Sequence, residues 1–329
     1  MLPLNRTPLT TRERRLGKRL VSRGERELFD SLLQFRGATL SDRLHLGRLF
    51  AVGGEGAIFQ VLDTAAPTER LVGKIPLATW HKPIHLTSKI LRAKRKVIED
   101  EEALLRTAGS RFLPESHGLF HVPNPNLEVA RGGAFSEPEP CMVMERLGGQ
   151  DLDTWLCRVH RGSVDKTILK KTLDRLVVGV IQSLVDLENR GFLYADLRPG
   201  NLRVVGRPQR RVRLLDAGGC VPVGADGSRF PHVPSYLPPH LFRDQAKDGI
   251  APSPAVQAVM AGRTLYEVAT GQTPKAGRHI DMVRLLRAPV SPAVSEVIAG
   301  LAGGDLEHCA DALQMLAKRA KRRVRPDQL

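Results

Sequence analysis

The most informative segments of the sequence are Tyr194-Ala-Asp196-Leu-Arg198-Pro-Gly-Asn201 and, after it, Leu214-Leu-Asp216-Ala-Gly218. The first stretch comes after a long helical pattern and carries a carboxylate and an amide five positions apart. Such a pair in one loop can present a general base and a metal ligand side by side. The second stretch is an apolar strand that ends in Asp-x-Gly, a common way to present a carboxylate to a metal ion. Asp196, Asn201 and Asp216 are therefore candidate groups of a chemical site.

Two further signals lie nearer the N-terminus. Ala51-Val-Gly53-Gly54-Glu-Gly56-Ala-Ile58 separates two expected strands. Its glycines allow backbone N–H groups to approach phosphate oxygens closely, although a plain hairpin turn would look the same. Val72-Gly73-Lys74 lies on the next expected strand, where a lysine among apolar neighbours needs an anion as its partner.

The order of hydrophobic patterns predicts an α+β chain. We expect strands at 46–52, 57–62, 71–75 and 141–147, and helices at 87–107, 167–190, 254–270 and, as a pair, 292–318. The stretch 121–140, rich in Pro and Gly, is expected to connect two strands. Strands followed by helices indicate two packed parts of the α+β kind.

The four signals, in this order, resemble the eukaryotic-type (Hanks-type) serine/threonine protein kinases over about residues 42–316. The resemblance implies a two-lobed protein-kinase-like fold, with an N-lobe of antiparallel sheet and one helix at 42–147 and a mainly helical C-lobe at 148–316. A basic N-terminal extension at 1–41 and a basic tail at 317–329 would flank the two lobes.

The resemblance also implies an ATP-dependent phosphotransferase that uses Mg²⁺. Lys74 would hold the α- and β-phosphates, and Glu101 would be its partner, chosen over Glu99 and Glu102 by the family's spacing. Asp196 would be the catalytic base, Arg198 would contact the γ-phosphate, and Asn201 and Asp216 would bind Mg²⁺. The expected nucleotide-binding residues are Ala51 (in place of the first glycine), Gly53, Gly54, Gly56, Ile58, Gly73, Lys74, the gatekeeper Met144, and the backbones of Glu145 and Leu147.

Several positions depart from the family. Ala195 replaces the Arg that grips an activation-loop phosphate, so we expect no activation by that route. Ala217 replaces the Phe of Asp-Phe-Gly, and Gln257 replaces an Asp. Arg203 stands where an apolar residue lies under the adenine, and its alkyl stem can substitute. His240 replaces the Glu that closes the activation segment.

The complete catalytic set favours transfer to Ser/Thr hydroxyls of a protein. Two alternatives stay open. The altered segment around His240 is compatible with a kinase of small molecules or sugars. The departures in the activation segment, together with Arg203, are compatible with a pseudokinase scaffold.

Composition limits the other possibilities. The 329 residues carry a net charge of +15, concentrated at the two ends, which we interpret as solvated tails rather than as sites for nucleic acid or acidic lipid. The charge also favours an acidic protein substrate. An aromatic share of 5% argues against a stacking surface for single strands. No apolar run approaches a transmembrane length, and four cysteines without metal-ligand spacing suggest free thiols in a reducing compartment, so we expect a cytoplasmic protein.

Overall fold

The computed structural model describes residues 29–53, 56–68, 70–76, 87–124, 134, 137–161, 166–206, 211–225, 236–237 and 252–303. The chain divides into two compact units, one of residues 1–107 and 114–146 and the other of residues 108–113 and 147–329. Gly54, His240, the C-terminal tail and most of the N-terminal extension lie outside the described residues.

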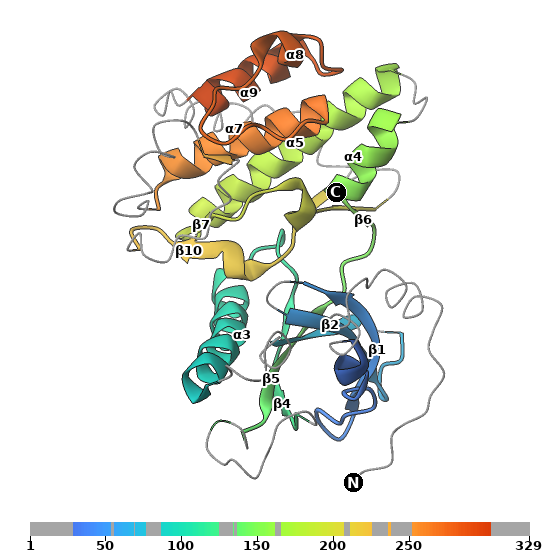
Figure 1. Cartoon of the computed structure of the whole chain (residues 1–329). Coiled ribbons are helices and arrows are strands. Elements are labelled where there is room, and N and C mark those ends of the chain that lie inside the picture. Colours follow the sequence, from blue (N-terminus) through green and yellow to red (C-terminus); the bar gives the residue numbers. More distant parts are fainter. Residues whose placement is uncertain are drawn as a thin grey trace. The chain divides into compact units, whose positions relative to one another are not determined.

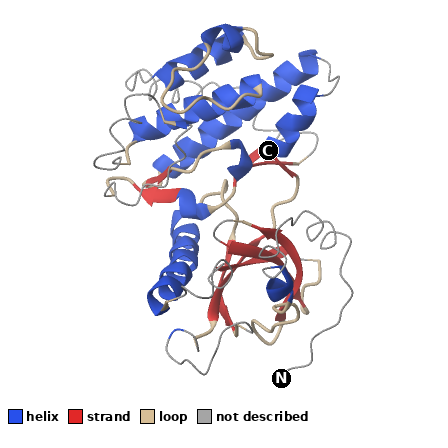
Figure 2. Ribbon diagram, viewed as in Figure 1, coloured by secondary structure: helices blue, strands red, loops and turns tan. Residues whose placement is uncertain are grey.

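The first unit is built on one antiparallel sheet with strand order β1-β2-β3-β5-β4 (Figures 1 and 2). Its strands are β1 (Leu44–Val52), β2 (Gly56–Asp63), β3 (Leu71–Pro76), β4 (Ser116–Val122) and β5 (Glu139–Glu145). The stretch rich in Pro and Gly thus connects two paired strands, as expected. Besides the helix α3 (Ser88–Ala108), the unit has a short helical segment at 29–33.

The two faces of this sheet have different tasks because side chains alternate along a strand. One face packs into an apolar core whose members include Phe29, Leu32, Phe35, Leu46, Leu49, Phe59, Val61, Cys141 and Val143. The short helical segment at 29–33 contributes to this core. The other face carries Lys74, which contacts α3.

Helix α3 has an unusual buried stripe. Leu91, Ile98 and Leu105 are at most 3% exposed and recur at the helical spacing, which explains why the segment folds onto the sheet. Arg95 and Glu101 are equally buried, at 4% and 1%. Charged groups at such depth need partners, and both have them.

The second unit is mainly helical. Its helices are α4 (Leu152–Arg161), α5 (Lys166–Glu188), α7 (Pro254–Thr270), α8 (Met282–Leu286) and α9 (Pro292–Gly303). Helix α7 begins where Ser253 Oγ accepts a hydrogen bond from Val256 N (3.2 Å) and ends at Gly271 with a left-handed φ of 70°. The expected α+β class, a sheet with a helix followed by a helical part, is confirmed.

The second unit also contains two small sheets, of which only the strand before Asp216 was predicted. One has the order β6-β8-β9, with β6 (Gln150–Asp151), β8 (Leu202–Val205) and β9 (Arg211–Leu214). The other pairs β7 (Phe192–Tyr194) with β10 (Cys220–Pro222). These strands matter because the candidate site residues lie in the connections that leave them. Among the described residues, no helix has the length and apolarity needed to cross a membrane.

Candidate active site

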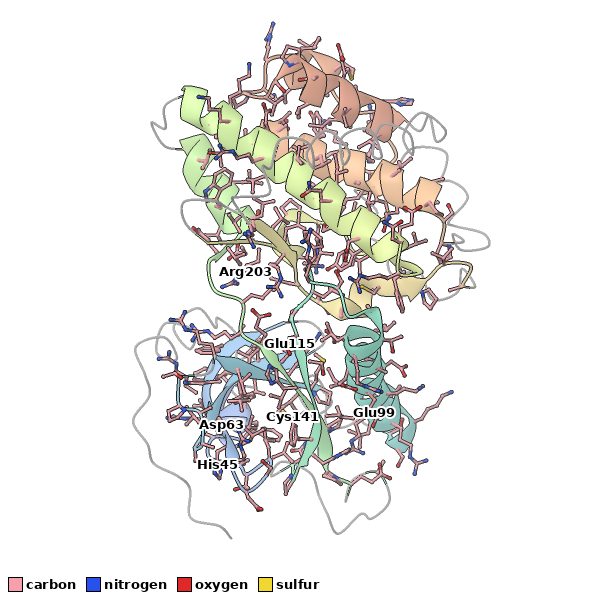
Figure 3. The ribbon with its side chains drawn as sticks, turned by 180° about the vertical axis from the view of Figure 1, so that it is seen from behind. His45, Asp63, Glu99, Glu115, Cys141 and Arg203 are labelled. Carbon is pink, nitrogen blue, oxygen red and sulfur yellow. The ribbon has the colours of Figure 1, made fainter. Side chains whose placement is uncertain are left out.

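Lys74 and Glu101 form a buried ion pair in the first unit. Strand β3 and helix α3 bring Lys74 Nζ to 2.6 Å from Glu101 Oε2, and the two side chains are 7% and 1% exposed. Glu99, a competing candidate, is exposed on α3 (Figure 3). Glu102, the third, accepts a hydrogen bond from Ser116 Oγ (2.9 Å). Glu101 is thus the acidic candidate that contacts Lys74.

Several nucleotide-binding candidates lie on the same face of the sheet as Lys74. Ile58 lies directly opposite Lys74 across β2 and β3, and Ala51 lies opposite Ile58. Met144 lies opposite Val72, two residues before Lys74. Residues opposite one another, or two apart, share a face. Ala51, Ile58, Val72, Lys74 and Met144 therefore line one surface.

Gly73 does not belong to this surface, which corrects its assignment as a nucleotide contact. A Cβ atom on Gly73 would lie 2.8 Å from Cys141 Sγ and 3.2 Å from Val61, so the residue faces the core. The period of two along a strand makes Val72 the residue on the Lys74 face. Figure 3 shows Cys141 on β5.

The glycine turn between β1 and β2 leaves room for the lysine. Gly53 N donates to Gly56 O (2.9 Å), which closes the turn. A Cβ on Gly56 would lie 2.9 Å from Ile75 O and 3.2 Å from Lys74 Cγ. A side chain at position 56 would therefore displace Lys74 or strand β3.

At the end of β5, Glu145 N donates to Glu115 O (2.8 Å). The first unit itself therefore uses this N–H. Leu147, the other backbone candidate, is buried and is the first residue of the longer segment, 147–329, of the second unit.

In the second unit, Asp196 and Asn201 are joined within one loop. Asn201 Nδ2 donates to Asp196 Oδ2 (2.6 Å) and to the Asp196 carbonyl oxygen (2.9 Å). Both bonds use the amide nitrogen, so Oδ1 is the atom with which Asn201 can coordinate a cation. Arg198 Nε lies 3.4 Å from Asp196 Oδ1 on a side chain that is 47% exposed. Leu215 N donates to Asn201 O (2.7 Å), which ties this loop to the residue before Asp216.

Asp216 has a strained backbone that other groups hold in place. Its φ of 59° and ψ of 81° are left-handed, and no other non-glycine among the described residues has a positive φ. Such a conformation costs about 1–3 kcal/mol and persists only where the surroundings impose it. The Tyr194 hydroxyl donates to the carbonyl oxygens of Leu215 and, at 3.2 Å, of Asp216. Tyr194 thus braces the residue that carries the candidate metal ligand.

Two side chains of helix α7 form hydrogen bonds with the segment around Asp196. Tyr194 N donates to Gln257 Oε1 (2.6 Å), and Thr264 Oγ1 donates to Leu197 O (2.7 Å). Both α7 side chains are completely or almost completely buried. They anchor the chain on either side of Asp196. Sequence reasoning gave Tyr194 and Thr264 no role, and it noted Gln257 only as a departure.

The donor set suits Mg²⁺, a hard cation that prefers a few protein oxygens with water and phosphate oxygens completing its shell. Asp216 offers a carboxylate and Asn201 an amide oxygen. Among the described residues, no group of three or more His, Cys, Asp or Glu side chains is placed to hold a metal ion by itself. Asp216 and Asn201 would supply two oxygen ligands of Mg²⁺, and phosphate and water oxygens would supply the others.

Several known proteins are similar to this chain in sequence. No protein-family model matches the chain. It is 24% identical over 257 residues to the probable serine/threonine-protein kinase PknB of Bifidobacterium longum, covering 73% of this chain and 32% of the relative. It is 24% identical to the serine/threonine-protein kinase PkaB of Streptomyces coelicolor, and the match covers 71% of this chain and 54% of the relative. It is 26% identical to the serine/threonine-protein kinase PknA of Mycobacterium tuberculosis, and the match covers 73% of this chain and 50% of the relative.

The chain is thus similar in sequence to bacterial serine/threonine protein kinases. It spans between a third and about half of the length of these relatives.

Arg203, a departure from the kinase pattern, is bound to the chain's own backbone. Its Nε donates to Gly148 O (3.1 Å) and its Nη2 to Gly149 O (3.2 Å). Gly149 has a left-handed φ of 80°, and a Cβ there would overlap Val204 O. Arg203 therefore holds the glycine pair against β8, a contact for which an apolar residue has no donor.

Proposed function

We propose that this chain transfers the γ-phosphate of ATP to Ser/Thr hydroxyl groups of a protein. The observation that carries the proposal is the combination of the 2.6 Å Lys74–Glu101 pair with the Asp196–Asn201 pair, also 2.6 Å, and the braced Asp216. Phosphoryl transfer depends on positioning and on charge more than on covalent chemistry of the protein. The Lys74–Glu101 and Asp196–Asn201 contacts hold charged and polar groups in fixed positions, which supports such a role.

In this proposal each residue handles one part of the charge. Lys74 neutralises the α- and β-phosphates, and Glu101 keeps its ammonium in place. Arg198, on a half-exposed side chain, faces the transferred phosphate. Mg²⁺ held by Asn201 and Asp216 would supply the positive charge that the phosphate oxygens need. Asp196 accepts or orients the proton of the attacking hydroxyl.

The acceptor and the location follow from weaker signals. The net charge of +15 supports an acidic protein as substrate. A cytoplasmic location remains a prediction from the cysteines. Among the described residues, Cys141, Cys157 and Cys220 are free thiols.

The test is transfer of radiolabelled phosphate from ATP to the chain itself, to casein as an acidic protein acceptor, to histone as a basic one, and to small sugars. We expect labelled phosphoserine or phosphothreonine, more on casein than on histone, and none with Asp216→Asn. Label on small sugars alone would indicate a small-molecule kinase. No label on any acceptor, with no thermal shift from Mg-ATP, would overturn the proposal in favour of a scaffold.

A further inference from the structure

Arg95 is a buried cation at the centre of a fully used set of hydrogen bonds. Its Nε and Nη2 donate to the two carboxylate oxygens of Glu139 (3.0 and 3.1 Å). Its Nη1 donates to Ala134 O (2.8 Å) and Glu137 Oε2 (2.9 Å), and Nη2 also donates to Glu137 O (3.0 Å). A guanidinium has five N–H donors, so these five contacts occupy all of them. Asn124 Nδ2 also donates to Glu139 Oε1 (2.9 Å).

The Arg95–Glu139 hydrogen bonds join helix α3 to the start of strand β5. Both elements are labelled in Figure 1. Arg95 is 4% exposed and Glu139 is completely buried. An apolar side chain at position 95 would continue the Leu91–Ile98 stripe, so the arginine is not needed merely to bury the helix. A planar, bidentate pair fixes direction as well as distance.

The Arg95 cluster and the Lys74–Glu101 pair attach the same helix at two points. Arg95 and Glu101 lie six residues apart on α3, about 9 Å along the helix axis. Glu139 belongs to β5, and Lys74 lies on β3, whose register pairs it with Met142 of β5. A helix attached at one point can still turn or tilt, whereas two attachments to neighbouring strands of one sheet remove both motions.

We propose that Arg95, through Glu139, is a positioning residue that holds α3 so that Glu101 stays against Lys74 without any further activating event. The proposal rests on the phosphotransferase function proposed above. In this proposal, contacts within the first unit alone hold α3 in the position that the phosphotransferase function requires. The absence of an arginine at Ala195, expected to abolish control by an activation-loop phosphate, agrees with such a device.

The test compares wild type with Arg95→Met/Glu139→Gln in the full chain. The double change removes both buried charges, so neither is left unpaired, and the Gln oxygen still accepts from Asn124. We expect amide hydrogen exchange in residues 96–104 to accelerate at least ~10-fold, while β1 and β2 are unchanged. We also expect kcat to fall at least ~10-fold with KM for the protein acceptor unchanged, since Lys74 acts on the nucleotide.

The matched control is Lys96→Met/Asp100→Asn, which removes an exposed ion pair (2.9 Å) from the same helix. We expect it to leave exchange and kcat as in wild type. If Arg95→Met/Glu139→Gln keeps both quantities within about two-fold of wild type, the proposal is wrong. If the double variant does not fold, Arg95→Lys, which retains the charge but not the fork, is measured in the same way, and wild-type values would again overturn the proposal.

The two proposals fail differently. A wild type that transfers no phosphate overturns the proposed function, but hydrogen exchange in α3 still decides the role of Arg95. A wild type that transfers phosphate, with a double variant equal to it in both measurements, overturns the Arg95 proposal alone.

Discussion

Lys74 Nζ lies 2.6 Å from Glu101 Oε2 in a place where water has almost no access to either side chain. Burying two charges costs free energy that their attraction barely offsets, so a buried pair is weak evidence of a contribution to stability. Breaking such a pair is a different matter, because the remaining charge has no solvent. This asymmetry separates an activity effect from a folding effect at the same site.

Lys74→Met leaves the Glu101 carboxylate buried without its partner. We expect it to lower the free energy of unfolding by about 3–5 kcal/mol and to abolish phosphate transfer. The double variant Lys74→Met/Glu101→Met removes both charges, so most of the stability should return while transfer stays absent. Urea titrations and transfer rates measured on the three proteins check this. A double variant that regains transfer would show that the pair has only a structural role.

The Tyr194 hydroxyl braces the strained backbone at Asp216. Tyr194→Phe removes only that oxygen, and we expect the loss of about 1 kcal/mol of stability. Because Asp216 is then held less firmly, the affinity for ATP with Mg²⁺ should fall ~10-fold, while the affinity for ATP without metal should not change. Calorimetric titrations with and without Mg²⁺ measure both affinities.

The control is Tyr266→Phe, which removes the same atom from a buried tyrosine of α7. It should leave both affinities unchanged. An equal loss in the two variants would assign the effect to general loosening of the second unit.

The comparison of sequence and structure separates local from tertiary information. Strand and helix periods in the sequence predicted α3, α7 and four of the five strands of the N-terminal sheet to within a few residues, since these elements bury long apolar faces. No residue range was predicted for strand β4. The strands β6 to β10 are two to four residues long and carry no such period. Their existence depends on the loops they join, so the sequence pattern indicated only β9, the strand that precedes Asp216.

The same distinction applies to the site. Motif spacing was enough to choose Glu101 among three neighbouring acids, and that residue contacts Lys74. Spacing within one strand was also available for Val72 and Gly73, and the period of two should have favoured Val72. The Arg95 cluster and the Tyr194 hydroxyl could not be foreseen, because each joins residues that are distant in sequence.

Gly73 allows β3 and β5 to pack closely on the core face. Gly73→Ala would bring a Cβ to 2.8 Å from Cys141 Sγ, and we expect a loss of about 1–3 kcal/mol of stability from overpacking. Gly73→Ala/Cys141→Ala removes the clashing sulfur and should recover much of this loss. Gly148→Ala, where nothing lies within 4 Å, is the neutral control. Denaturation midpoints measure all three. No loss in Gly73→Ala would mean that this residue does not face the core.

Burial of Cys141 raises the pKa of its thiol to about 12. The thiol is neutral in the folded state well above its ordinary pKa of about 8.5, and the thiolate is the reactive form. At pH 8 we expect iodoacetamide to modify the exposed Cys157 and not Cys141 in the native protein, and both in urea. Mass spectrometry of peptides reads this out.

The sign of the linked pH dependence follows from the same shift. Because the folded pKa of Cys141 lies above the unfolded one, the contribution to stability is complete below about pH 8.5 and decreases as the pH rises toward about 12. Cys141→Ala should remove this part of the alkaline loss. Rapid native labelling of Cys141 at pH 8 would contradict the burial on which the argument depends.

Asp196 separates the catalytic role from the role in binding. Its carboxylate accepts a hydrogen bond from Asn201 Nδ2 (2.6 Å), and an Asn at this position can still present an oxygen to that donor. Asp196→Asn should therefore keep the loop intact, and Asn201 and Asp216 should still hold Mg²⁺. The variant lacks only the carboxylate beside the attacking hydroxyl, so we expect transfer to fall at least ~10²-fold, the lower range for a positioned base. Calorimetric binding of Mg-ATP should change little. Asp216→Asn is the matched control, since it should weaken binding and transfer together. If Asp196→Asn weakens Mg-ATP binding as much as Asp216→Asn does, then Asp196 is a metal ligand or a structural residue rather than the base.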